Sequence, residues 1–172
     1  MIKQSHRILG SVTKYTAGLG MLFLLGAMLI TTSDVILRKM DGAGIYGTID
    51  LIQLMILSAA YLSIPQTFMS GSHVAVSIIT DRLPLRPAAL FQLIGALLSC
   101  CFMFAIMVFS FTQAQMQNEY GDISMTLGLP MIYYWIPLVI GSALSVLVAL
   151  HLCIASFYTL VTQRDVLSLH KP

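Results

Sequence analysis

The chain has 172 residues, of which 58% are hydrophobic and 9% are charged, and its mean hydropathy is +0.88. A water-soluble domain of this size could not carry so apolar a surface, so most of the outer surface is expected to face lipid. The net charge is only +2 and the basic residues are dispersed, a pattern that argues against nucleic acid as a partner.

The first half of the chain holds two long stretches without charged residues. One begins at Tyr15, and at about 1.5 Å of rise per residue it just crosses a hydrocarbon core of about 30 Å. We predict a first transmembrane helix over residues 15–37 and a second over residues 49–69. Pro65 is expected to kink or end the second helix close to Ile64, because proline removes a helical hydrogen bond.

The second half of the chain repeats this plan after a proline-containing loop. Pro84 and Pro87 favour a break in the chain, so a third helix is predicted over residues 88–115. A fourth is predicted over residues 131–161, which is longer than a perpendicular span requires and is expected to tilt or project. The fold class is thus an all-α membrane protein with four transmembrane helices, short loops and a single membrane domain over residues 1–172.

The distribution of basic residues predicts the orientation of these helices. With four spans both termini lie on one side of the membrane, together with the central loop. That side would hold seven of the nine basic residues, namely Lys3, Arg7, Lys14, Arg82, Arg86, Arg164 and Lys171. The other side would hold Arg38 and Lys39. Since cytoplasmic loops carry an excess of Lys and Arg, we expect the N and C termini to be cytoplasmic.

The predicted spans offer little chemistry. An ionisable residue inside a span usually marks a pathway for a proton or a substrate, but Asp34 and Asp50 stand at span ends. His151 lies within the fourth helix and is interpreted as a lone, neutral, hydrogen-bonded histidine. The three cysteines lie in apolar runs without the spacing of a zinc site. We therefore predict no catalytic residue, no metal, no cofactor and no enzyme.

Small residues recur at a spacing of four on the predicted fourth helix, at Gly141, Ser145 and Ala149. Such stripes let helix backbones approach closely in a membrane. The stripe serves either packing within this chain or docking to another membrane protein, and the sequence leaves both open.

Two segments carry a family resemblance. They are DVILR at residues 34–38, followed by a glycine-rich turn and GTIDLIQLMIL, and GSHVAVSIITDRLP at residues 71–84. Both are similar to the small, four-helix DctQ-like subunits of tripartite ATP-independent periplasmic (TRAP) transporters. The chain departs from that family at Asp50, where glutamate is usual, and at Ser72 and Ser77, where charged residues are common.

The resemblance implies a role in transport without catalysis. Subunits of this family assemble in the bacterial inner membrane with a large permease (M) subunit that binds substrate and sodium, while a periplasmic binding protein delivers the solute. This chain would then be a scaffold for symport of organic acids, with lipid and the two other components as its partners. The candidate subunit-interface residues are Asp34, Arg38, Asp50, Gly71, His73, Asp81, Arg82, Pro84, Gly141, Ser145 and Ala149.

Other interpretations remain open for some of these features. Asp34, Arg38 and Asp50 either order the outer ends of the first two helices for docking or anchor them at the interface. A small accessory or assembly subunit of another membrane complex would show the same lack of chemistry. A small proton-coupled exporter also has four helices, but it needs a carboxylate in mid-span.

Overall fold

The computed structural model describes residues 2–70 and 85–162. These residues form four long helices, α1 (Ile2–Asp41), α2 (Thr48–Met69), α4 (Leu85–Tyr120) and α5 (Ile132–Thr162). Each helix is long and apolar enough to cross a membrane. The predicted four-helix membrane architecture is therefore confirmed.

Helix α1 is much longer than the span that the charges predicted. It has 40 residues rather than the 23 of residues 15–37, and at about 1.5 Å per residue it is about 60 Å long, twice the thickness of a hydrocarbon core. Charged residues limit the part of a helix that can lie in lipid, but they do not end the helix, because Lys and Arg are good helix formers. The prediction located the apolar part and missed the polar extensions.

Helix α2 closely matches the predicted range of residues 49–69, and of the two effects expected of Pro65, an end of the helix near Ile64 does not occur. Pro65 lies inside the helix, which continues to Met69, and its side chain is among the most deeply buried in the chain. Proline removes one backbone hydrogen bond, and that loss is tolerated in a membrane helix where a neighbouring helix packs against the site. Here Gly141 of α5 lies against the backbone carbonyl of Tyr61, which is the group that lacks its helical partner.

Helix α4 also extends beyond its predicted limits at both ends. It begins at Leu85, so Pro87 falls in the first turn, where the missing N–H has no helical partner in any case. At the other end the glutamine-rich segment of residues 113–118 is helical, and the helix continues to Tyr120. Glutamine is a good helix former, so polarity alone did not mark the end of the helix.

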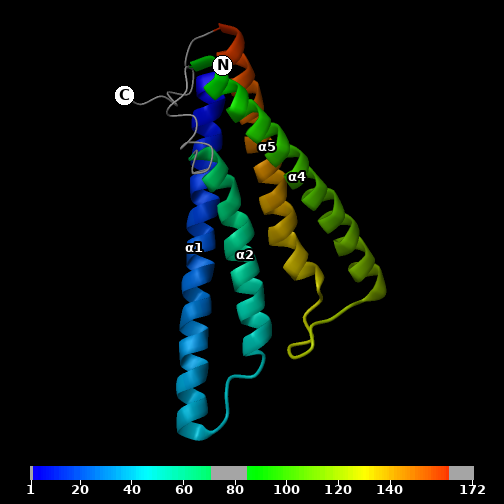
Figure 1. The fold of residues 1–172 in the computed structure, drawn as a ribbon. Coiled ribbons are helices and arrows are strands. Elements are labelled where there is room, and N and C mark those ends of the chain that lie inside the picture. Colours follow the sequence, from blue (N-terminus) through cyan, green and yellow to red (C-terminus); the bar gives the residue numbers. More distant parts are fainter. Residues whose placement is uncertain (1, 71–84, 163–172) are drawn as a thin grey trace.

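The four helices are arranged in the spatial order α1, α2, α5, α4 (Figure 1). Helix α2 packs between α1 and α5, while α4 packs against α5 alone among the described helices. The two hairpins, α1–α2 and α4–α5, are therefore joined chiefly along the contact between α2 and α5. Figure 1 shows α4 leaning away from α1 and α2 towards the loop that joins α4 to α5.

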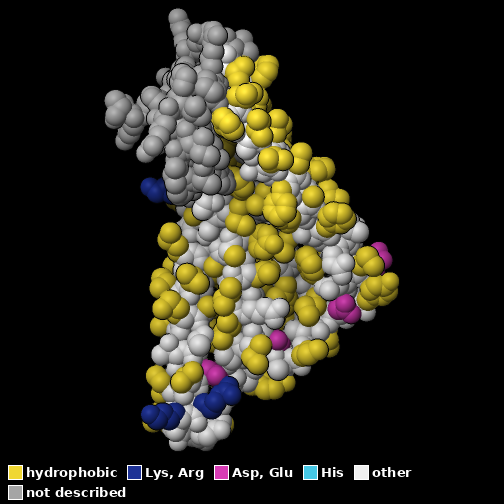
Figure 2. Space-filling model, viewed as in Figure 1, with side chains coloured by type: hydrophobic (Ala, Val, Ile, Leu, Met, Phe, Trp, Pro, Cys, Tyr) yellow, Lys and Arg dark blue, Asp and Glu magenta, His cyan; other side chains and the backbone are white. Residues whose placement is uncertain are grey.

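The core is small because much of each helix faces outward. A buried cluster joins the hairpins through Phe68 of α2, Met103 of α4, and Val146 and Val148 of α5. Figure 2 shows hydrophobic side chains spread over the visible face, with Lys and Arg at the end where α1 and α2 are joined. An apolar exterior of this kind belongs in lipid or against another membrane protein.

Candidate functional site

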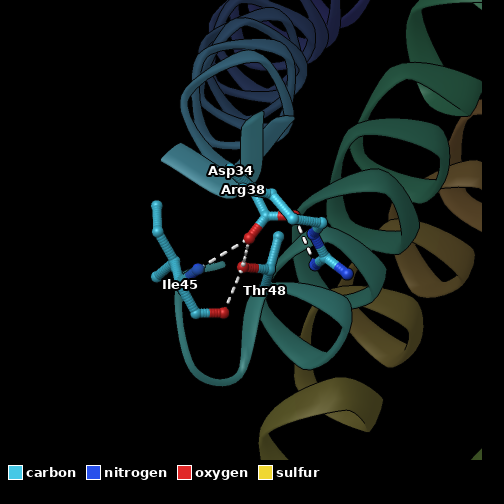
Figure 3. A network of polar contacts seen from close by, with 4 residues as sticks. All are labelled: Asp34, Arg38, Ile45 and Thr48. Carbon is cyan, nitrogen blue, oxygen red and sulfur yellow. Dashed lines mark hydrogen bonds and ion pairs between the residues drawn. The ribbon is translucent and has the colours of Figure 1, made fainter. Parts of the chain in front are cut away.

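The carboxylate of Asp34 closes the loop between α1 and α2. Its Oδ2 accepts a hydrogen bond from Nη2 of Arg38 at 2.7 Å, which is an ion pair across one turn of α1. Its Oδ1 accepts the backbone N–H of Ile45 at 2.7 Å and lies 3.0 Å from Oγ1 of Thr48 (Figure 3). Asp34 is only 7% exposed, so these donors replace the water that the carboxylate has lost.

The turn over this carboxylate requires glycine. A Cβ atom at Gly44 would lie 2.6 Å from Oδ1 of Asp34 and 2.7 Å from Nη2 of Arg38. Gly42 and Gly47 have φ angles of 71° and 78°, which side-chain-bearing residues rarely adopt. The glycine-rich segment of the sequence thus lets the chain reverse directly over the Asp34 carboxylate.

Asp50, in the first turn of α2, connects the two hairpins. Its Oδ2 accepts the backbone N–H groups of Thr126 at 3.1 Å and Leu127 at 2.9 Å, both in the loop between α4 and α5. Its backbone carbonyl accepts the O–H of Tyr134 on α5 at 3.1 Å. A side chain at Gly47 would overlap Leu127, so this loop lies directly against the start of α2. Asp50 therefore joins parts of the chain that are far apart in sequence.

The loop between α4 and α5 is also ordered by its own hydrogen bonds. The backbone N–H of Ser124 donates to the carbonyl of Leu129 at 2.8 Å, and the N–H of Leu129 donates to Oγ of Ser124 at 3.1 Å. At the loop's two ends, Nε1 of Trp135 donates to Oε1 of Gln117 at 2.6 Å. Asp50 thus meets a loop whose backbone is already arranged to present two N–H groups.

The small-residue stripe lies inside the chain. Ser145 and Ala149 are both 0% exposed, and a Cβ atom at Gly141 would overlap the backbone carbonyl of Tyr61 on α2. That carbonyl is the one that Pro65 cannot bond, because proline has no N–H. The burial of the stripe favours internal packing, the first of the two alternatives drawn from the sequence.

The remaining candidate interface residues lie outside the described part of the chain. They are Gly71, His73, Asp81, Arg82 and Pro84. Two of the departures from the family pattern, Ser72 and Ser77, lie there as well. The role of this segment in subunit contact stays a prediction.

The sequence suggested that His151 is a lone histidine, and the structure contradicts that interpretation. Its ring stacks on that of His6 from α1, with the ring centroids 5.6 Å apart. Histidines so far apart in sequence give no signal of contact until α1 and α5 are placed side by side. Within residues 2–70 and 85–162, no group of three or more His, Cys, Asp or Glu residues is placed to hold a metal ion.

Sequence reasoning identified Asp34, Arg38 and Asp50 but missed what Asp50 binds. Its partners are backbone N–H groups, which any residue type could supply, so the sequence carries no direct signal for them. Sequence reasoning also missed Tyr134, which is 7% exposed and donates its O–H to the backbone carbonyl of Asp50.

These observations define a class of protein. Four apolar helices, with buried carboxylates satisfied by the chain's own donors at one end, make a small multi-pass membrane protein. Residues 27–159 match the family described as tripartite ATP-independent periplasmic transporters, DctQ component, and the chain belongs to that family. It is also 28% identical over 137 residues to the ectoine TRAP transporter small permease protein TeaB of Halomonas elongata, which covers 76% of this chain and 71% of that protein.

Proposed function

We propose that this chain is the small subunit that braces the large, sodium-coupled permease of a TRAP transporter in the bacterial inner membrane. The transporter would take up organic acids delivered by a periplasmic binding protein. Membership of the DctQ family supports the place in a TRAP system. The observation that best supports a bracing role is that both buried carboxylates, Asp34 and Asp50, bind donors within this chain.

A subunit that moved a proton or an ion by itself would need ionisable groups available along its spans. Asp34 lies near the end of α1 and Asp50 near the start of α2. Both oxygens of Asp34, and Oδ2 of Asp50, accept hydrogen bonds from donors within this chain. These carboxylates therefore order the helix ends rather than offering a site for a solute. This arrangement is the one expected of a rigid partner.

The outward faces of the two edge helices supply the surface that a brace requires. On α1, Leu22 and Leu29 are 65% and 69% exposed, and on α4, Phe102 and Phe109 are 64% and 74% exposed. A permease whose transport domain moves needs a fixed partner that is held in the bilayer by extensive apolar contact. We propose that one of these edges contacts the large subunit while the other faces lipid.

Co-purification tests this proposal. The chain is produced together with the large permease of its own system, extracted in a mild detergent and isolated through a tag on this chain. We expect the large subunit to be retained, and uptake to require both subunits and the binding protein. A chain that purifies alone and transports by itself would contradict the proposal. The solutes tested include ectoine beside organic acids, because the relative's name refers to ectoine.

The proposed orientation places the termini in the cytoplasm and the Asp34 and Asp50 end on the outside. Lys14 and Lys39 are both exposed residues of α1 and lie towards its opposite ends. In a cysteine-free background, Lys39→Cys should react in intact cells with a membrane-impermeant maleimide, whereas Lys14→Cys should react only after the membrane is opened. The reverse pattern would contradict the orientation and leave the co-purification result unaffected.

A further inference from the structure

Helices α1 and α5 meet at the end of the molecule opposite Asp34. Along most of the bundle α2 lies between them. At the last residue of α2, Met69 is close to α1, since a Cβ atom at Gly10 would lie 3.7 Å from Cε of Met69. His6 lies one helical turn beyond Gly10, so its stack with His151 joins α1 to α5 just past the end of α2.

In the stacked pair of His6 and His151, one ring nitrogen of each residue lacks a hydrogen-bond partner among the described residues. The planes of the two rings are inclined by only 22°. Nδ1 of His6 and Nε2 of His151 are buried, and neither has a hydrogen-bond partner in the described part of the chain. Buried polar atoms without partners are uncommon and costly in proteins, so a pair of them in one contact calls for a physical reason.

A metal ion is a poor explanation of this pair. Nearly parallel stacked rings direct the lone pairs of their nitrogens side by side rather than towards one point between them. The described residues also bring no further His, Cys, Asp or Glu to complete a ligand set. What two adjacent imidazoles can still take up is protons, because histidine changes its charge between about pH 5 and 8.

We propose that His6 and His151 form a proton-sensitive clasp that holds the inner ends of α1 and α5 together when the rings are neutral and releases them when both are protonated. Neutral rings stack favourably in a partly buried contact. Two imidazolium ions at this separation repel each other, and burial strengthens the repulsion relative to water. Acidification on this side of the membrane therefore opens the contact.

The surroundings of the pair contain no carboxylate that could neutralise a second proton, as far as the described helices show. Among the described side chains of α1, the neighbouring charge is Arg7, which is itself positive and exposed. The described α2 carries a single acidic residue, and that residue is at its opposite end. Among the described side chains in this half of α4 and α5, the titratable groups besides His151 are the thiols of Cys100, Cys101 and Cys153 and the phenol of Tyr158. None of these groups would stabilise two adjacent imidazolium ions in the closed contact.

Opening the clasp would act on α1 rather than on the whole bundle. The apolar cluster next to it includes Leu9 of α1, Phe68 of α2 and Leu152 of α5, and α2 keeps its long contact with α5. Asp34 still fastens the other end of α1 to the start of α2. The inner end of α1 is thus the part that gains freedom.

Distance measurement between spin labels tests the clasp. Labels are attached at Ile8 on α1 and Ile154 on α5, which are 59% and 61% exposed, in a full-length, cysteine-free chain held in lipid nanodiscs. Between pH 8 and pH 5 we expect the distance distribution to shift to longer values. A distribution that does not change with pH would overturn the proposal.

The matched control keeps the aromatic stack and removes the proton site. In His151→Phe the labels should stay at the short distance at both pH values, and His6→Phe should behave in the same way. A shift with pH in these variants as large as in the parent chain would also overturn the proposal. Because the parent distribution decides the question by itself, the test stands even if one variant folds poorly.

Discussion

Asp34 and Asp50 are residues of the same type, lie close together in the sequence and have the same 7% exposure, yet they stabilise different levels of the structure. Asp34 binds groups within 14 residues of itself and closes one loop. Asp50 binds backbone groups 76 and 77 residues away and joins one hairpin to the other. The difference shows that a buried acidic residue at a helix end can order a turn or fix the tertiary arrangement, depending on which donors surround it.

The comparison also separates local from global stability in this fold. Because the backbone of α4 packs against α5 rather than against α1 or α2 among the described helices, the hairpins are joined chiefly by the α2–α5 contact and by Asp50. Changes at those places should loosen the whole bundle. Changes at the Asp34 loop should remain local.

The largest effect is expected from Gly141→Leu. The new side chain would overlap the Tyr61 carbonyl and force α5 away from α2, at a cost of about 1–3 kcal/mol. Gly18→Leu is the matched control, because Gly18 lies in another apolar helix with no atom within 4 Å of an added Cβ. Thermal unfolding in detergent should show a lower melting temperature for the first variant alone. Equal melting temperatures for the two variants would contradict the importance of the α2–α5 contact.

Asp50→Ala should follow in size. It leaves the N–H groups of Thr126 and Leu127 without their acceptor, and we expect the melting temperature to fall by about 5 °C. Hydrogen exchange should accelerate in the loop between α4 and α5 and at the start of α2. Glu119→Ala removes an exposed carboxylate near the same loop and serves as the control. If both variants behave alike, Asp50 is not the link between the hairpins.

Asp34→Ala should have a smaller and more confined effect. Its donors all lie in α1, the following loop and the first residue of α2, so we expect a fall in melting temperature of about 2 °C. Hydrogen exchange should accelerate over residues 42–48 and stay unchanged in the loop between α4 and α5. Acceleration in both loops would remove the distinction between the two carboxylates.

Arg38→Ala should have the smallest effect of the four. The side chain of Arg38 is 63% exposed, so its ion pair with Asp34 is screened by water, and the backbone donor from Ile45 remains. We expect a change in melting temperature of no more than about 1 °C. A loss as large as that of Asp34→Ala would show that the ion pair, rather than the backbone donor, stabilises this loop.

The sequence predicted the apolar architecture well because lipid imposes a simple rule on composition. Uncharged intervals located all four helices, and the segment from Asp34 through Asp50, together with residues 71–84, carried the family resemblance that the match over residues 27–159 confirms. The length of α1 was underestimated because a charge ends a span without ending a helix, whereas the predicted ranges of α2 and α5 agree with the structure to within one residue at each end.

Contacts between distant elements could not be predicted in the same way. The acceptors and donors that matter most are backbone groups, such as the N–H of Leu127 and the carbonyl of Tyr61, and every residue type carries them. The stack of His6 on His151 depends on where α2 ends relative to its two neighbours. Such contacts follow from three-dimensional geometry rather than from local pattern.

Reconstituted uptake tests the central claim most directly. The large permease of the same system is placed in proteoliposomes with or without this chain, and uptake of labelled solute is measured with a sodium gradient and purified binding protein. We expect uptake only when this chain is present, with Glu119→Ala fully active and Gly141→Leu impaired. Full uptake by the large subunit alone, or uptake by this chain without the large subunit, would contradict its role as a bracing subunit.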